Sequence, residues 1–389
     1  MANISGNQRY AGVHVIRFFL AALVLVCSCT AEDVRETKTV AEGFRYTMIR
    51  QSAVPNVIHI FDIDLNNPLI EIDAFKAEHH LRATRLLSQI VRQAGQEDVI
   101  GAVNGDFFSK EGYPSGAMVH DGQILKNPAD PWYALVITQN KKVFIEQITF
   151  SGTMIINSFT NMGIDGFNKQ RQANEAVMYN RFFGPQTNTN TYGAEVTIRA
   201  KFAGKSIGDT VRGIVMAVDS VSGNNPITDS TVVVSVHGEE KIKLVRRMFV
   251  GQILELVIRA DLREDKIRTV IGGFPFLVNN QVNLITGNPE ATSDFYANRT
   301  ARTAVGIADS TNRLYLVCVD GNQANYSAGM TLAELADWMI GLGCTRALNL
   351  DGGGSTTMMI RDNVINRPSD GIEREISNAL LIRQRQPFK

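Results

Sequence analysis

Short apolar runs, each about the length of one strand, recur from Phe44 towards the C-terminal end of the chain. Between residues 194 and 271 almost every run is of this kind. Apolar residues at helical spacing occur in two stretches, 79–94 and 331–342, and the second begins with the capping box Thr331-x-x-Glu334. The pattern therefore predicts an α+β fold, a single mixed-sheet domain with few helices.

One strand–helix–strand unit is expected near the C-terminus. An apolar run at 314–319 precedes the 331–342 helix, and a second run follows at 347–350. Such a βαβ unit places its two strands parallel, and ligands bind at their carboxyl ends. Asp320 and Asp351 follow the two runs directly, so we expect both carboxylates at one edge of the sheet.

The N-terminal segment is predicted to be a lipoprotein-type signal peptide covering residues 1–28. Arg9 and Arg17 precede a short apolar run, which ends at Cys27-Ser28-Cys29. We expect lipidation of Cys29, a membrane anchor, and export to a bacterial cell envelope; an ordinary cleaved signal with an incidental cysteine is the alternative. Residues 29–43 are expected to form a linker, and residues 44–389 the folded domain.

Composition limits the partners of the chain. The 39 Lys+Arg residues balance the 39 Asp+Glu residues, so nothing indicates a nucleic-acid partner. A hydrophobic content of 44% excludes an intrinsically disordered chain. Apart from Cys27 and Cys29, only Cys318 and Cys344 are present, and their places in the expected βαβ unit lie too far apart for a disulfide. We therefore predict two free, buried thiols.

Three glycine-containing segments follow apolar strands, and these carry the candidate chemistry: Asn104-Gly105-Asp106, Asp320-Gly321, and the run 349–357. Taken alone, the first is commonly a turn and the second a strand exit. The third reads Asn-Leu-Asp-Gly-Gly-Gly-Ser-Thr-Thr, and three successive glycines let backbone N–H groups converge on an anion. It lacks the Gly-Lys-Ser/Thr ending of a nucleotide-binding P-loop, which excludes an ATPase of that type.

Taken together, these segments resemble the phosphodiester glycosidase family. The resemblance rests on Asn104-Gly-Asp-Phe-Phe, Ile271-Gly-Gly-x-Pro, Arg302-Thr-Ala-Val-Gly, Asp320-Gly, Ser327-x-Gly-Met-Thr-Leu, the run 349–357 and Arg374-x-x-x-Asn-Ala-Leu. It extends over essentially the whole chain after the leader. It implies hydrolysis of the glycosidic C–O bond of a sugar-1-phosphodiester, of the GlcNAc-1-phosphodiester type, to a free sugar and a phosphomonoester.

The resemblance also implies roles for individual residues. Asp106 and Asp351 would be the carboxylates acting at the sugar, with the division of labour between them left open. Arg302 would bind the phosphate, and Asp320 would be a third catalytic member or a metal ligand. The substrate- and phosphate-binding set would comprise Asn104, Gly105, Gly273, Thr303, Asn349, Gly352, Gly353, Gly354, Ser355 and Thr356.

Other function classes stay open at this point. In a metal-dependent phosphodiesterase the Asp cluster would hold Mg²⁺ or Ca²⁺ and water would attack phosphorus. Another glycoside hydrolase acting on surface glycans, or a non-catalytic glycan-binding lipoprotein, would also carry such motifs. The resemblance requires no cofactor, although a divalent cation at Asp320 is compatible with it. The six histidines lack the spacing of a zinc site.

Overall fold

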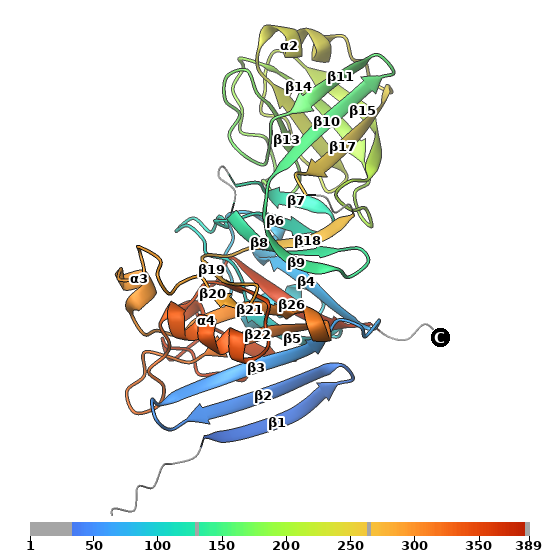
Figure 1. Ribbon diagram of the computed structural model, residues 1–389. Helices are drawn as coiled ribbons and strands as arrows, with labels where there is room; N and C mark the ends of the chain where they lie inside the picture. Colours follow the sequence, from blue (N-terminus) through green and yellow to red (C-terminus); the bar gives the residue numbers. More distant parts are fainter. Residues whose placement is uncertain (1–32, 129–131, 263–265, 386–389) are drawn as a thin grey trace, which may run out of the picture.

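The computed structural model describes residues 33–128, 132–262 and 266–385, which form four β-sheets with few helices (Figure 1). The basal sheet consists, in spatial order, of β1 (Val34–Ala41), β2 (Phe44–Gln51), β3 (Asn56–Asp64), β22 (Arg313–Val319), β21 (Arg302–Ala308), β23 (Arg346–Asn349), β19 (Phe276–Asn279) and β20 (Val282–Asn283). The inner sheet consists of β25 (Asn363–Val364), β24 (Met358–Ile360), β5 (Val99–Asn104), β26 (Asn378–Gln384) and β4 (Ile70–Lys76).

The other two sheets lie towards the top of Figure 1. The central sheet consists of β7 (Gln123–Lys126), β6 (Met118–His120), β18 (Ile267–Gly272), β8 (Trp132–Thr138) and β9 (Val143–Ile148). The distal sheet consists of β11 (Thr160–Ile164), β10 (Phe150–Asn157), β17 (Ile253–Ala260), β15 (Thr210–Asp219), β14 (Ala194–Ala200), β16 (Thr231–Val236), β13 (Ala176–Tyr179) and β12 (Gly166–Phe167). Its edge strands contact strands at the opposite edge, so the distal sheet approaches a closed barrel.

The helices are short. The α-helices are α1 (Leu87–Gln93), α2 (Glu239–Arg246), α3 (Asp294–Ala297) and α4 (Leu332–Gly341), and the 3₁₀ turns are η1 (Ala77–His79), η2 (Asp309–Thr311) and η3 (Gly353–Ser355). The Thr331 hydroxyl accepts the Glu334 N–H, while the Glu334 carboxylate accepts the Thr331 N–H, so the expected capping box forms at the start of α4. Within the described residues no helix is both long and apolar enough to cross a lipid bilayer.

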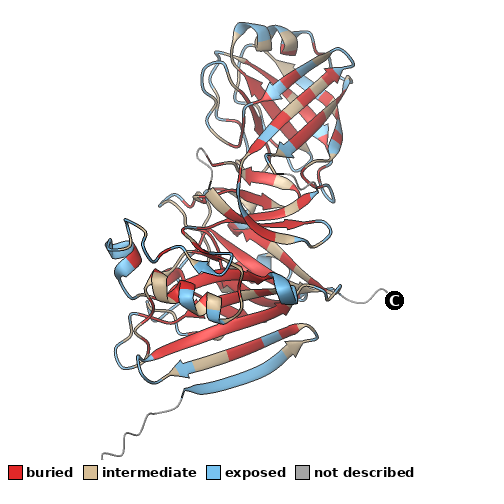
Figure 2. Cartoon of the chain, in the orientation of Figure 1, coloured by how far each residue is buried: buried red, intermediate tan, exposed pale blue. Residues whose placement is uncertain are grey.

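Three apolar cores join these layers. One core fills the space between the basal, inner and central sheets and includes Phe61, Val103 and Leu135. A second lies between the central and distal sheets, and a third is where α4 covers the outer face of the basal sheet. Figure 2 shows β3 buried along most of its length and β1 exposed at the edge.

The predicted fold class, an α+β single mixed-sheet domain with one βαβ unit, was wrong. The structure is mostly β, with several sheets, and its paired strands in the described residues are antiparallel except for β12 and β13. The strands β22 and β23 run in the same direction, but β21 lies between them and pairs antiparallel with both. Every residue of β21 is buried, which fits a central strand covered on both faces.

The prediction of two free, buried thiols is confirmed. Cys318 and Cys344 are both free and buried. Cys318 lies in β22, whereas Cys344 lies in the turn after α4, close to Gly306. Burial raises the pKa of each thiol to about 12, so both are protonated and unreactive at neutral pH.

Candidate active site

The candidate active site lies where the inner and basal sheets meet. Asp106 follows β5 of the inner sheet and Asp351 follows β23 of the basal sheet. The Asp351 N–H donates to the Gly105 carbonyl over 2.9 Å, and the Asn104 side-chain amide donates to the Asp351 carbonyl over 2.6 Å. Two segments far apart in the sequence therefore bring their carboxylates to one place.

Asn104 is the centre of this frame, since it is fully buried and bonds to several segments at once. Its Oδ1 accepts from the Thr303 hydroxyl at 2.7 Å and from the Thr357 N–H at 3.2 Å. The Thr303 hydroxyl also lies 3.3 Å from Oγ1 of Thr356. The structure thus brings together predicted site residues from the ends of β5, β21 and β23.

The Asp106 carboxylate is buried, with one oxygen bonded and the other without a partner. Oδ2 accepts the Gly116 N–H at 2.7 Å, whereas Oδ1 has no hydrogen-bond partner among the described residues. Burial raises the pKa of Asp106 to about 7, with a smaller contribution from the nearby Asp351 charge. A Cβ on Gly272 would lie 2.9 Å from Oδ2, so glycine is needed for the backbone to approach this carboxylate.

Asp351 is held by the loop that follows it. Its Oδ1 accepts the Gly352 N–H at 2.9 Å, and Ser355 hydrogen-bonds the carboxylate as well. Burial raises the pKa of Asp351 to about 6, although these hydrogen bonds and the Arg374 charge oppose the rise. Two carboxyl groups with pKa values near neutrality in one site suit general acid–base catalysis.

The glycine-rich loop differs from the anion cradle that the sequence suggested. The Gly352 N–H donates to Asp351, and the Gly353 N–H donates to the Ala301 carbonyl at 2.7 Å. An anion bound by these two amides would have to replace those acceptors. The Gly354 backbone instead lies against the Arg374 side chain, since a Cβ there would lie 2.2 Å from Cζ of Arg374.

Arg302 is buried and bonds only to backbone carbonyls. Its Nε donates to Met330 at 3.0 Å, and its Nη2 donates to Phe295 at 3.0 Å and to Asn298 at 2.9 Å. No carboxylate among the described residues forms an ion pair with it, and burial lowers the pKa of its guanidinium to about 10. A buried cation without a counter-ion favours binding of an anion nearby.

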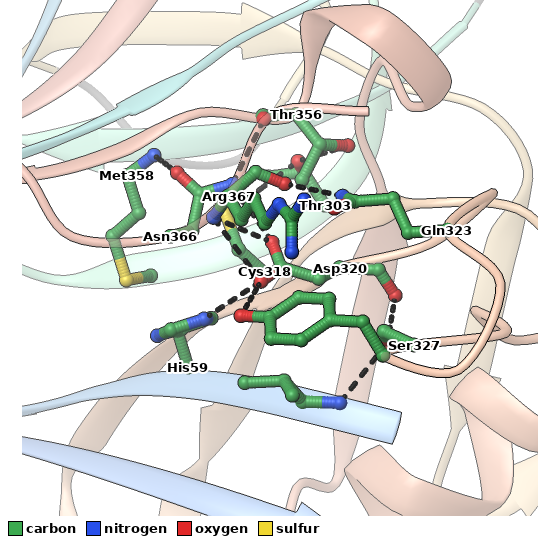
Figure 3. A network of polar contacts seen from close by, with 12 residues as sticks. His59, Thr303, Cys318, Asp320, Gln323, Ser327, Thr356, Met358, Asn366 and Arg367 are labelled. Atoms are coloured by element: carbon green, nitrogen blue, oxygen red, sulfur yellow. Dashed lines mark hydrogen bonds and ion pairs between the residues drawn. The ribbon is translucent and has the colours of Figure 1, made fainter. Parts of the chain in front are cut away.

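Asp320 lies at the centre of the hydrogen-bond network shown in Figure 3, which Asn366 connects to Thr356 and Thr303. Its Oδ2 bonds to His59 at 3.2 Å and accepts the Tyr326 hydroxyl at 2.9 Å, and its Oδ1 accepts the Asn366 amide at 3.0 Å. The Arg367 N–H lies 3.1 Å from both oxygens. With both oxygens engaged, this carboxylate is placed to hold structure together; in the described residues no group of three His, Cys, Asp or Glu side chains could hold a metal ion.

Asn349 and Gly273 hold the segment after β18 against the end of β23. The Asn349 amide donates to the Phe274 carbonyl at 2.7 Å, and its Oδ1 is buried without a partner in the described residues. A Cβ on Gly273 would lie 2.5 Å from the Asn349 carbonyl oxygen, so the backbone segments that contain Gly273 and Asn349 are in close contact.

Cys29, the predicted lipidation site, lies outside the described residues.

Sequence reasoning assigned no role to Asn378 or Arg374, although the motif Arg374-x-x-x-Asn378 contains both. Asn378 Oδ1 accepts the Asp106 N–H at 2.7 Å. Arg374 is half exposed, pairs with Asp370 at 2.7 Å, and lowers the pKa of Asp351 by its charge. Several buried polar atoms in this region lack partners within the described structure: Asp106 Oδ1, Asn349 Oδ1, Thr357 Oγ1 and Asn378 Nδ2.

These features place two buried carboxyl groups with raised pKa values in one site. Residues 192–383 match the sequence model of the phosphodiester glycosidase family, so the expected resemblance to that family is confirmed. The bovine N-acetylglucosamine-1-phosphodiester alpha-N-acetylglucosaminidase is 40% identical over 70 residues, 18% of this chain and 13% of that protein. The SPbeta prophage-derived uncharacterized protein YomE of Bacillus subtilis is 37% identical over 81 residues, 21% of this chain and 12% of that protein.

Solved structures share the fold. A hypothetical protein from Synechocystis superimposes with a TM-score of 0.67 at 19% identity, covering 90% of this chain and 64% of that chain. A candidate exported protein from Burkholderia pseudomallei K96243 gives a TM-score of 0.60 at 20% identity, covering 85% of this chain and 75% of the other. The chain matches only about an eighth of the length of the two curated relatives.

Proposed function

We propose that this protein hydrolyses the glycosidic C–O bond of a sugar-1-phosphodiester and releases a free sugar and a phosphomonoester. The observation that carries the proposal is the pair of buried carboxyl groups, Asp106 and Asp351, whose pKa values are raised to about 7 and about 6. Glycoside hydrolysis needs two such groups on either side of the anomeric carbon. Further buried polar atoms near them form no hydrogen bond within the described residues, and a sugar that reached the site would supply hydroxyl groups to them.

The acid role falls to Asp106, whose Oδ1 accepts no hydrogen bond from the described residues, and the charged role to Asp351, whose carboxylate accepts hydrogen bonds from Gly352 and Ser355. As the C1–O bond breaks, its electron pair passes to the phosphate oxygen, which Asp106 protonates. Asp351 either removes a proton from the water that bonds to C1 or bonds to C1 itself before water replaces it. A phosphate is a good leaving group, so this chemistry places modest demands on the acid.

The two arginines support an anionic substrate. Arg302 supplies a buried positive charge that has no carboxylate partner, and its Cδ lies close to the Gly352 backbone. Arg374 supplies a second positive charge at the surface beside Gly354. Stabilising negative charge as it develops on the departing phosphate is the largest contribution such groups make to a rate.

The substrate proposed first is a GlcNAc-1-phosphodiester, because the bovine relative is named for that bond. The test is hydrolysis of GlcNAc-, glucose- and mannose-1-phosphodiesters in ¹⁸O-labelled water, with and without EDTA. We expect the label in the sugar and no effect of EDTA. Label in the phosphate product together with EDTA inhibition would show P–O cleavage by a metal-dependent phosphodiesterase instead.

Export and lipid anchoring of this enzyme complete the proposal. Residues 1–28 would be the leader and Cys29 the lipidated residue, and one structural relative is itself named as a candidate exported protein. Cys29→Ala should lose membrane association and the mass of the acyl chains. An unchanged distribution between membrane and soluble fractions would refute the anchor without affecting the hydrolase proposal.

A further inference from the structure

Four aromatic side chains form a continuous chain of ring contacts beside the candidate active site. The Phe107 and Phe295 ring centroids are 6.1 Å apart, and those of Phe295 and Phe274 are also 6.1 Å apart with the planes inclined by 22°. Trp132 follows, with its centroid 5.5 Å from that of Phe274. We call these four residues the aromatic platform.

The platform is exposed at its centre. Phe274 is 39% exposed and Phe295 is 38% exposed, whereas Phe107 and Trp132 are partly buried. Two apolar rings that lie nearly parallel at the surface leave a contiguous apolar face that a ligand can cover. Their exposure therefore points to a ligand with an apolar surface.

Residues of the candidate site fix the positions of both exposed rings. The Phe274 carbonyl accepts from the Asn349 amide at 2.7 Å, and the Phe295 carbonyl accepts from Arg302 at 3.0 Å. The platform is thus held in place by the same side chains that surround the two carboxyl groups. Such preorganisation lowers the entropy lost when a ligand binds.

The platform reaches the Asp106 carboxylate through Gly116. The Cβ position of Gly116 lies 3.2 Å from Oδ2 of Asp106 and 3.4 Å from Cε3 of Trp132, so one small residue separates the indole from the carboxylate. Phe107 follows Asp106 directly in the chain, and Phe274 lies two residues after Gly272, whose backbone is close to the Asp106 carboxylate. Apolar rings thus adjoin polar atoms that lack partners.

We propose that Phe274 and Phe295 form a stacking subsite for a pyranose ring of the substrate. This deepens the proposed function and rests on it for the phosphate part of the ligand. A pyranose presents C–H groups on its face and hydroxyl groups at its edge. The electron-rich faces of aromatic rings attract the C–H groups, while Asp106, Asn349 and neighbouring polar atoms receive the hydroxyl groups. A lipid or an apolar peptide would leave those polar atoms unsatisfied.

The test measures binding in the absence of turnover, with Asp351→Asn as the background. Calorimetry with the methyl pyranosides of glucose and GlcNAc, and separately with inorganic phosphate, would compare this variant with one that also carries Phe274→Leu and Phe295→Leu. We expect the affinity for a methyl pyranoside to fall at least tenfold, with the affinity for phosphate unchanged. Phe159→Leu, at a 98% exposed phenylalanine in the β10–β11 turn, is the matched control.

Intrinsic fluorescence provides a second readout. The chain has two tryptophans, so Trp338→Phe leaves Trp132 of the platform as the sole reporter. A methyl pyranoside should change its emission in a saturable way, and Phe274→Leu should weaken that response. No saturable response, an unchanged pyranoside affinity in the doubly substituted variant with an unchanged melting temperature, or an equal loss of phosphate affinity would each overturn the proposal.

Failure of the stacking subsite is distinguishable from failure of the hydrolase function. If phosphodiesters are hydrolysed with the same KM after Phe274→Leu and Phe295→Leu, the subsite is refuted and the hydrolase stands. If no phosphodiester is hydrolysed but the leucine variants lose pyranoside binding, the subsite stands and the reaction is refuted.

Discussion

The side-chain amide of Asn104 donates to the backbone carbonyl of Asp351 over 2.6 Å, and this bond connects the inner sheet to the basal sheet. The same Asn104 accepts from Thr303, so one buried amide fixes the ends of three strands. A buried amide that loses such partners costs about 1–3 kcal/mol for each polar group left unsatisfied. The distance between the two candidate catalytic carboxyl groups therefore depends on a residue that does no chemistry itself.

Both carboxyl groups should contribute to turnover. Asp106→Asn and Asp351→Asn preserve side-chain shape while removing a titrating group, so the fold should persist. Turnover of a sugar-1-phosphodiester should fall at least ~10²-fold in Asp351→Asn, the lower range for a positioned acid or base, and by a smaller factor in Asp106→Asn, because the phosphate is a good leaving group. Asp98→Asn, at an exposed position before β5, is the matched control and should retain full activity. Full activity in Asp351→Asn would place the reaction elsewhere.

The pH dependence of kcat should be bell-shaped. Asp351 must be charged, so activity should fall below its pKa of about 6, and Asp106 must be protonated, so activity should fall above its pKa of about 7. The two apparent pKa values of the pH–rate profile describe Asp106 and Asp351 as a pair, because the two groups interact. A rate that stays constant between pH 5 and pH 9 would contradict these assignments.

Asp106→Asn should stabilise the protein at alkaline pH while abolishing activity. The folded-state pKa of Asp106, about 7, lies above its ordinary value of 3.8, so the fold favours the protonated form. That contribution is present at low pH and is lost as pH rises through about 7. Because the pKa of Asp106 rises from 3.8 to about 7 on folding, the unfolding free energy of Asp106→Asn at pH 8 should exceed that of the wild-type protein by at most about 4 kcal/mol.

Denaturant unfolding at pH 4 and pH 8 measures this effect. The wild-type protein and Asp106→Asn should have similar stability at pH 4, and the variant should be the more stable at pH 8. A variant that is less stable at both pH values would show that the Asp106 carboxylate contributes to the fold in its charged form.

Arg374 should contribute to phosphate binding with little effect on stability. Because it is half exposed and charge-assisted hydrogen bonds contribute roughly 1.5 kcal/mol or more, Arg374→Gln should raise KM for phosphodiesters by about tenfold. An aryl glycoside of the same sugar has no phosphate and should keep its KM. Arg92→Gln, at an exposed arginine in α1, is the control. Equal changes for both substrates would exclude a specific role on phosphate.

Arg302→Lys should reduce both phosphodiester hydrolysis and stability. Lysine keeps the charge but loses the planar group that donates to Phe295, Asn298 and Met330. Hydrolysis of phosphodiesters should therefore fall more than hydrolysis of an aryl glycoside, and the melting temperature should decrease. Comparable losses on both substrates would mean that Arg302 serves only to position α3.

Local patterns predicted the parts of the fold that depend on local interactions. The capping box at Thr331 correctly predicted the start of α4, and strands such as β16 and β17 appear at the expected residues. The stretch 79–94 was expected to be one helix, but only Leu87–Gln93 is α-helical. The polar stretch 165–193 lacks a strand-like pattern over most of its length, yet it contains β13, which is buried and pairs with β16 in the distal sheet.

Long-range pairing determined the rest. The position of β21 between β22 and β23 cannot be deduced from the spacing of apolar residues in the sequence, because it depends on which strands pair in the folded sheet. Asp106 and Asp351 were chosen from their motifs, and the structure places them in contact through Gly105. The contacts of Asn378 with Asp106 and of His59 with Asp320 join residues more than 250 positions apart, so local sequence patterns could not predict either pairing.

The position of β26 determines when, during synthesis of the chain, the candidate site can be assembled. This strand lies between β5 and β4 and brings Asn378, whose backbone carbonyl and side chain hold Gly105 and Asp106. A nascent chain that has been made as far as residue 370 already contains both candidate carboxyl groups but lacks the strand that aligns one of them. The candidate site would therefore be assembled only after β26 has been inserted into the inner sheet.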